Sequence, residues 1–129
     1  MKRDHDHATI VDFLIAGMYR IYLLLHDKQW QEAFTQVYTN LTVVERFNEF
    51  LVYSKHTFML SQLLQKMDLK EQAMQVLDFL RDFVEDTNLN KEAILVYEEI
   101  GRINQEDKDY HMALKAYKRM LQIAWFEND

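Results

Sequence analysis

The side chains of this 129-residue chain best suited to metal binding or proton transfer are its five histidines, and their spacing assembles no site. No histidine belongs to a His-Glu-x-x-His or Glu-x-x-His pattern, the spacings that place metal ligands on one face of a helix. His5 and His7, with Asp4 and Asp6, could bind a metal weakly, but such a polar N-terminus is more often disordered. We therefore treat residues 1–7 as a disordered tail and expect no metal site.

The carboxylates do not form a catalytic pair either. General acid–base catalysis needs two carboxyl groups that face each other, whereas residues adjacent in sequence diverge around a helix. The chain has no cysteine, which excludes thiol nucleophiles, and two isolated glycines cannot build a phosphate-binding loop. We therefore expect no enzyme, no cofactor and no small-molecule substrate. The adjacent acidic pairs are Glu85-Asp86, Glu98-Glu99 and Glu106-Asp107.

Composition predicts an all-α fold. The chain has no proline, its only glycines are Gly17 and Gly101, and it is rich in good helix formers. A sheet protein would need many more turn residues. The net charge of −6 repels phosphate backbones, so we expect no nucleic-acid partner. The absence of cysteine fits a reducing compartment, and we expect a cytoplasmic protein.

The stretch 8–25 is apolar enough to raise the question of a membrane helix. Asp12 and Arg20 interrupt it, and charges are costly in lipid. No small-residue cleavage site follows, as a signal peptide would require. We therefore expect a soluble helix and no membrane partner.

Alanine recurs at intervals of forty residues, as Ala33, Ala73 and Ala113. Each alanine ends a similar phrase that opens with an aspartate. Aspartate is a good N-cap, because its carboxylate accepts hydrogen bonds from the free amides of the first helical turn. We therefore expect a helix to begin at each of these aspartates, which are Asp27, Asp68 and Asp107.

Asparagine recurs with the same period, as Asn48, Asn88 and Asn128. Asparagine tolerates the left-handed conformation that ends many helices, so these residues are expected to end the second helix of each repeat. Together the two landmarks divide the chain into helix–turn–helix repeats. The expected helices are 8–26, 28–46, 49–66, 69–86, 90–106 and 109–126.

The third repeat carries a recognisable spacing. Tyr97 is followed by Ile100 and Gly101, then by Ala113 twelve residues after the glycine, and by Tyr117 four residues later. This pattern resembles a tetratricopeptide repeat (TPR). Two small residues stand where antiparallel helices must touch, and the tyrosines fill the space beside that contact.

The other repeats follow this pattern less closely. The second repeat has Leu60, Ser61, Ala73 and Leu77 in the corresponding positions, and in the first repeat Ile21 takes the place of the small residue. The forty-residue period exceeds the usual length of about 34. It is similar to the longer variant in Pins-type polarity adaptors and rapsyn, which implies an association with the cytoskeleton.

The resemblance implies three stacked antiparallel hairpins in a right-handed α-solenoid spanning 8–129, with repeats of about 8–48, 49–88 and 89–128. In such arrays the first helix of each hairpin lines a concave face. Apolar residues of the first helix, Ile15, Met18 and Leu25, would continue that face. The partner-binding residues that the resemblance implies are Tyr22, Lys55, Phe58, Gln62, Gln65, Lys66, Glu98, Arg102 and Gln105.

Three functional hypotheses remain open at this point. The first is an adaptor or scaffold that binds a peptide or helix of another protein on its concave face. The second is an assembly module that forms homo-oligomers through its apolar first helix and its uncapped C-terminal end around Trp125. The third is a regulatory domain of a larger enzyme or sensor.

Overall fold

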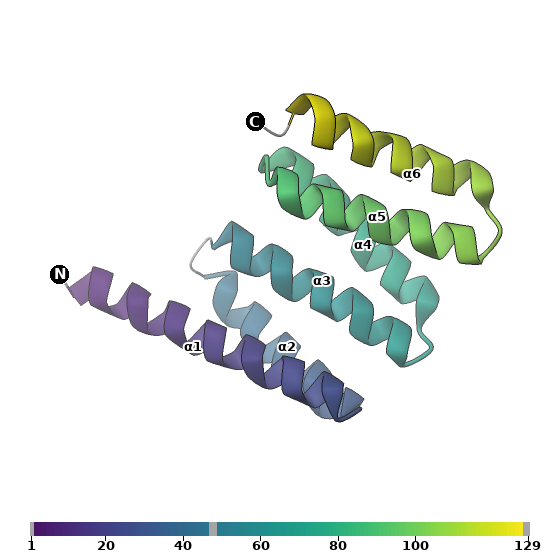
Figure 1. Cartoon of the computed structure of the whole chain (residues 1–129). Helices are drawn as coiled ribbons and strands as arrows, with labels where there is room; N and C mark the ends of the chain where they lie inside the picture. The colour runs from purple at the N-terminus through teal and green to yellow at the C-terminus, as the bar shows by residue number, and fades with distance from the viewer. Residues whose placement is uncertain (1, 47–48, 128–129) are drawn as a thin grey trace. The chain divides into compact units, whose positions relative to one another are not determined.

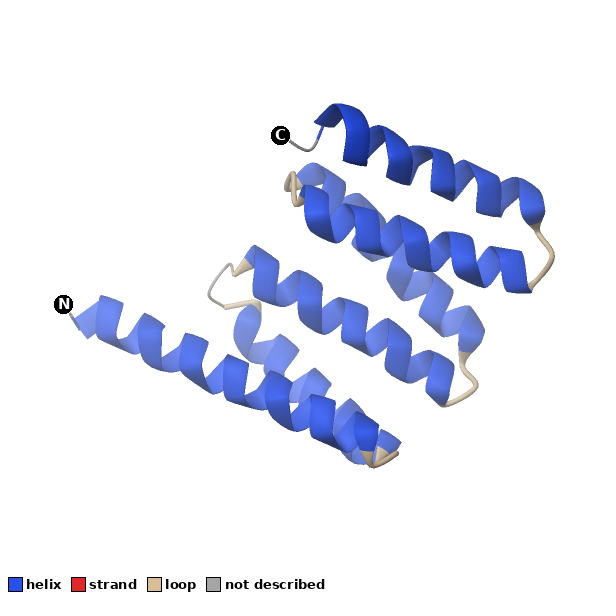
Figure 2. Cartoon of the chain, in the orientation of Figure 1, coloured by secondary structure: helices blue, strands red, loops and turns tan. Residues whose placement is uncertain are grey.

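The computed structural model describes the backbone of residues 2–46 and 49–127, and the side chains of these ranges from Thr9 onward. In this part of the chain there are six α-helices and no strand, which confirms the predicted all-α class (Figures 1 and 2). The helices are α1 (Lys2–His26), α2 (Trp30–Val44), α3 (Phe50–Lys66), α4 (Lys70–Asp86), α5 (Asn90–Glu106) and α6 (Tyr110–Gln122), followed by a π-helical turn, η1 (Ile123–Glu127).

The expected helix boundaries agree with the structure to within a few residues at most ends. The main difference lies at the N-terminus, where α1 begins at Lys2 and so includes residues that the sequence analysis treated as a disordered tail. No proline or glycine stands between Lys2 and Ala16 to end the helix. At the other end α6 stops at Gln122, and η1 takes up the remainder of the expected helix.

The chain divides into two compact units, unit 1 (Met1–Ala73) and unit 2 (Met74–Asp129), with the boundary inside α4. Within unit 1, α1 packs on α2 and α2 packs on α3. Within unit 2, α5 packs on α6, and η1 lies against both. Adjacent helices therefore pair in each unit. The division into three repeats by sequence stays a prediction.

Four helices end in the same left-handed turn. After α3, Asp68 has a φ of 61°, its amide donates to the Gln65 carbonyl, and the Leu69 amide donates to the Leu64 carbonyl at 2.8 Å. This pair of hydrogen bonds is the Schellman motif, which satisfies carbonyls at the end of a helix. The left-handed residues of the four turns are Lys28, Asp68, Asn88 and Lys108.

The prediction that an asparagine ends a helix in the left-handed conformation is confirmed at Asn88, with a φ of 57°. Asn48 and Asn128 lie outside the described residues. The prediction that aspartates cap the following helices is wrong at Asp68, which is itself the left-handed residue. The Schellman motif needs this extra residue, so the helices that follow the three aspartates, α2, α4 and α6, begin one or two residues later than expected.

The same correction applies to the other two aspartates. Asp27 and Asp107 follow the last residues of α1 and α5, so they end helices instead of starting them. The N-cap of α6 is Asp109, whose carboxylate accepts a hydrogen bond from the Met112 amide at 3.3 Å. Aspartate does cap this helix, but two residues after the position expected from the repeat.

The helix starts recur every twenty residues, half the period found in the sequence. At each start a backbone carbonyl accepts the amide hydrogen of the residue four positions later. The residue that donates this amide hydrogen is an alanine at four of the five starts. One of these is Ala93, which the sequence analysis did not note. The five pairs are Gln29 with Ala33, Glu49 with Tyr53, Leu69 with Ala73, Leu89 with Ala93, and Asp109 with Ala113.

The core of unit 1 lies where α1, α2 and α3 meet. Ile21, Ala33, Val37 and Leu63 are fully buried and form one cluster. Ile21, which stands at the expected small-residue position, is therefore a core side chain. Partly buried side chains surround the cluster, and they are Leu24, Leu25, Trp30, Phe34, Leu41, Met59, Leu60 and Met67.

The core of unit 2 contains the close helix contact that the TPR-like spacing suggested. A β-carbon at Gly101 would lie 2.4 Å from the ring of Tyr117, so α5 and α6 approach closely at this glycine. Ala113 is also buried, at 4% exposure. The Tyr117 hydroxyl donates to the Gln105 side chain at 3.0 Å. The ring of Tyr117 therefore packs directly against Gly101.

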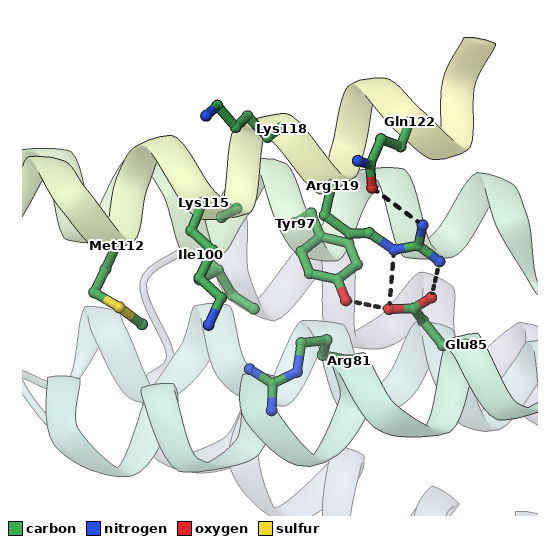
Figure 3. Close-up of a pocket in the computed structure, with 10 residues that line it drawn as sticks. Arg81, Glu85, Tyr97, Ile100, Met112, Lys115, Lys118, Arg119 and Gln122 are labelled. Atoms are coloured by element: carbon green, nitrogen blue, oxygen red, sulfur yellow. Dashed lines mark hydrogen bonds and ion pairs between the residues drawn. The ribbon is translucent and has the colours of Figure 1, made fainter. Parts of the chain in front are cut away.

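A charged network joins three helices of unit 2 near its surface (Figure 3). Glu85 of α4 accepts hydrogen bonds from the Tyr97 hydroxyl of α5 and from the Arg119 guanidinium of α6. Arg119 also donates to Glu127 at 2.9 Å. The hydrogen bond from Arg119 lowers the pKa of Glu85, which is therefore ionised near neutral pH. Burial and then the bond to Glu85 raise the pKa of Tyr97 to about 12.

The small residues assigned to packing in the sequence analysis are buried. Ser61 has no exposed surface, and its hydroxyl donates to the Phe58 carbonyl at 2.6 Å. Tyr97, which was expected to fill the space beside the small residues, is also buried, at 8% exposure. The alanines at the three equivalent positions are buried as well, and they are Ala33, Ala73 and Ala113.

Candidate functional site: an apolar groove between α1 and α3

An open groove of about 530 Å³ lies between α1 and α3 in unit 1. Its walls are almost entirely apolar, and Lys55 is the one charged side chain among the described residues that line it. Ligand-binding pockets in proteins are typically concave and mostly apolar, with few polar groups. The lining residues are Ile15, Met18, Tyr19 and Tyr22 of α1, and Leu51, Val52, Lys55 and Met59 of α3.

The α1 wall of the groove exposes large apolar side chains in a single stripe. Ile15, Tyr19 and Tyr22 are 55%, 67% and 65% exposed, and their spacings of four and three residues place them on one helical face. Leu51 of α3 adds a further exposed side chain at 44%. Soluble proteins rarely expose contiguous apolar patches of this kind without a partner.

The same helix has the length and composition of a membrane-spanning segment. The window Thr9–His26 has a mean hydropathy of 1.4, and 17% of it is buried within the structure. Most core helices of soluble proteins are far more covered, because their apolar side must be removed from water. Much of the window Thr9–His26 thus remains uncovered in the structure.

Buried polar contacts hold the helices that form the groove. A β-carbon at Gly17 of α1 would lie 2.3 Å from the side-chain amide nitrogen of Asn40 on α2. The same nitrogen lies 2.9 Å from Nε2 of His56 on α3, and Gln36 donates to the Asn40 carbonyl oxygen at 2.9 Å. Asn40 and His56 have no exposed surface. Asn40 therefore contacts both helices that line the groove.

The hydrogen bonds determine the protonation of His56. Its Nδ1 lies 2.8 Å from the Val52 carbonyl, which can only accept, so Nδ1 carries the proton. Nε2 then accepts from the Asn40 amide. Burial lowers the pKa of His56, and the bond to Val52 opposes this only in part. The imidazole is therefore neutral, and its backbone partner Val52 also lines the groove.

The structure brings together some of the partner-binding residues that the sequence analysis named. Tyr22 and Lys55 line the groove with Ile15 and Met18 of the expected apolar row. Leu25 packs against the core cluster instead. Four further named residues lie on α3 but do not line the groove. Of these Gln62 and Lys66 are exposed and Phe58 and Gln65 are half-buried.

The remaining named residues lie on α5 in unit 2. Glu98, Arg102 and Gln105 are exposed. Arg102 donates to Glu99 at 2.8 Å and to Glu106 at 2.7 Å, and these bonds raise its pKa above the ordinary arginine value. The Arg102 guanidinium therefore pairs with carboxylates of its own helix. The Gln105 side chain accepts a hydrogen bond from the Tyr117 hydroxyl.

The sequence analysis missed the polar contacts beneath the groove. Gly17 carried a signal, because an isolated glycine inside a helical pattern often marks a close packing contact. Asn40 and His56 carried none, since their burial depends on how three helices meet. Tyr19 was also missed, although its spacing from Ile15 and Tyr22 places it on the same face.

No cluster of three or more histidine, aspartate or glutamate side chains capable of holding a metal occurs in the described part of the chain. The side chains of His5 and His7 lie outside that part. Among the described residues, no carboxylate or imidazole lines the groove. Its chemistry is therefore that of apolar contact beside one positive charge.

Comparison with protein-family models, with curated protein sequences and with solved structures finds no match to this chain.

Proposed function

We propose that this chain is a TPR-like protein-interaction module that binds a helix or peptide segment of a partner protein in the groove between α1 and α3. Support for a TPR-like arrangement comes from the paired helices, the twenty-residue recurrence of the helix starts, and the packing of Gly101 on Tyr117. Repeat modules of this type commonly bind segments along the first helices of their hairpins. In this chain α1 and α3 hold those positions.

The observation that carries the proposal is the exposed apolar stripe of Ile15, Tyr19 and Tyr22 facing the groove. Tyrosines in such a stripe offer large contact area and lose little side-chain entropy on binding. A partner segment with apolar side chains at helical spacing would cover the stripe. An acidic residue in that segment would match Lys55.

The proposal is tested by selecting short peptides from a random display library on the wild-type protein. We expect the selected peptides to share apolar residues at spacings of three and four. Their affinity for a Tyr19→Ser/Tyr22→Ser variant should fall by roughly tenfold or more, since two contact side chains are lost. The matched control is Tyr38→Ser, which removes an equally exposed tyrosine, 62%, outside the groove.

Equal affinity of the peptides for the groove variant and the wild type would refute the groove as the binding site. Circular dichroism on all three proteins first establishes that they are folded. Loss of affinity in the Tyr38 control to the same degree would also count against the proposal, because binding would then depend on exposed tyrosine in general.

A second candidate function is assembly through α1, which is favoured by the small buried share of the Thr9–His26 window. In that case a second copy of the chain would cover the stripe. Sedimentation velocity over a range of concentrations measures this directly. Concentration-dependent association that the Tyr19→Ser/Tyr22→Ser variant abolishes would favour assembly over peptide binding. Binding of the wild type to phosphatidylcholine vesicles would instead assign the stripe to a membrane surface.

A further inference from the structure

Helix α6 differs in charge from the rest of the protein. The chain has a net charge of −6, yet Tyr110–Gln122 contains Lys115, Lys118 and Arg119 and no aspartate or glutamate. Spacings of three and four residues place all three cations on neighbouring positions of one side of the helix. A positive surface thus stands out on an acidic protein.

These cations border an open hollow of about 590 Å³ in unit 2. Figure 3 shows Lys115 reaching from α6 toward α4, and Arg81 of α4 also lines the hollow. Apolar side chains also line the hollow, with Ile100 and Ala116 buried and Met112 exposed at 41%. The hollow therefore combines an apolar surface with a positive edge.

Glu85, the one carboxylate among the described residues that line the hollow, does not oppose an anionic ligand strongly. Glu85 accepts hydrogen bonds from both Tyr97 and Arg119, so its charge is already matched by these donors. Arg119 is held between Glu85 and Glu127, and its side chain is 30% exposed. The paired Glu85 and Arg119 side chains are thus part of the lining of the hollow. The cations that would bind a ligand are Lys115, Lys118 and Arg81.

The lysines of the hollow are available for binding. Lys115 and Lys118 are exposed, and neither makes a hydrogen bond or an ion pair within the described ranges 9–46 and 49–127. Arg81 pairs with Asp78 at 3.4 Å and with Asp82 at 3.2 Å. Both aspartates are more than half exposed, so these pairs are weak and can exchange for a ligand.

We propose that this hollow is a second binding surface that takes an acidic peptide segment of a partner protein, with an apolar side chain against Ile100 and Met112 and carboxylates on Lys115 and Arg81. The charge pattern favours an extended acidic segment, because cations from two helices and apolar side chains line the same hollow. The surface lies within unit 2 and does not depend on the groove of unit 1.

The test is fluorescence anisotropy with a labelled peptide in which one leucine is flanked by two glutamates on each side. We expect binding at low salt that weakens as salt is raised, since the lysines are exposed. K115E should lower the affinity roughly tenfold, because it replaces attraction by repulsion at a cation that lines the hollow. K91E should change it less than about twofold, since Lys91 is exposed on α5 and outside the hollow.

A peptide with glutamine in place of glutamate should bind at least about tenfold more weakly if the carboxylates contact the cations. Replacing the leucine by serine tests the apolar contact in the same way. An equal loss in K91E and K115E would overturn the proposal, because the attraction would then be a diffuse property of charge. Absence of wild-type binding at millimolar peptide in low salt would overturn the proposal as well. It would also be overturned if a second copy of the chain occupied the hollow in place of the peptide.

Discussion

Unit 1 joins its helices through uncharged polar groups in its interior, whereas unit 2 joins its helices through charged groups near its surface. In unit 1 the Asn40 amide lies between Gly17 and His56 with no exposed surface. In unit 2 the Glu85 and Arg119 side chains are each about 30% exposed. A buried neutral contact depends on fit, and a partly exposed charged contact depends on solvent conditions.

The two units also differ in the surface that they present. Unit 1 exposes tyrosines and aliphatic side chains along α1, and unit 2 exposes lysines along α6. Burial of apolar surface is insensitive to salt, while attraction between exposed charges is screened over about 10 Å at 0.1 M salt. We therefore expect salt to separate the two proposed binding surfaces, because it should weaken binding in the hollow far more than in the groove, where Lys55 is the charged side chain.

Removal of the buried amide should produce the largest effect on stability. Asn40→Ala leaves Nε2 of His56 without its donor and opens space in the core, so we expect a loss of about 3 kcal/mol. The matched change in unit 2 is Asn104→Ala, which removes a half-buried bond to the Ile100 carbonyl and should cost about 1 kcal/mol. Chemical denaturation measures both, and equal losses would contradict the difference drawn between the units.

Addition of a methyl group at each glycine should give the next largest difference in stability between the two units. Alanine normally favours a helix over glycine by about 1 kcal/mol, but at Gly17 it meets an amide held by two hydrogen bonds. We expect Gly17→Ala to destabilise the protein by about 2 kcal/mol. Gly101→Ala should cost less, because the Tyr117 ring is half-buried and can move aside. Thermal unfolding of the two variants checks the order, and a smaller loss for Gly17→Ala would contradict it.

Neutralisation of the surface network should have a smaller effect that depends on salt and pH. Glu85→Gln keeps the shape of the side chain but removes its charge, so we expect a loss of about 1 kcal/mol at low salt. The pKa of Glu85 is lowered in the folded state, so its contribution is present above about pH 4.5 and is lost as the pH falls below that value. Hydrogen exchange in unit 2, with and without 1 M salt, measures the change. An equal loss at both salt concentrations would show that the charge is not responsible.

Protonation of His56 should have the smallest effect near neutral pH, where its imidazole is already neutral in the folded state. Because burial lowers the pKa of His56, the unfolded chain binds the proton first as the pH falls. Stability should therefore decline below about pH 6.5, and hydrogen exchange in unit 1 should report it. His56→Gln removes this dependence, although it also alters the contact with Asn40. An unchanged pH profile in that variant would assign the decline to other groups.

The sequence predicted the local features of the fold well. Helix ends depend on nearby residues, so the left-handed Asn88 and the buried Ala73 could be found from their types and spacing. Aspartate was ambiguous, because it suits both a helix N-cap and a left-handed position. At Asp68 the second role applies, and the predicted start of the next helix was therefore wrong.

The contacts between distant residues could not be predicted in the same way. Glu85 and Arg119 are thirty-four residues apart, and Asn40 and His56 are sixteen apart. No periodicity selects these pairs, since they depend on the angle and offset at which helices pack. Of the proposed groove, the sequence indicated Tyr22 and Lys55 but not the contribution of Tyr19 or Leu51.

The four left-handed turns have a mechanical consequence. Each places a residue with a β-carbon, such as Lys28 or Lys108, in a conformation that costs a non-glycine residue about 1 kcal/mol. Such a residue has fewer alternative conformations than glycine, so less conformational entropy is lost when the turn forms. Pulling on the chain should separate whole helices from their neighbours before the turns themselves open, so we expect each turn to keep its bent conformation under load.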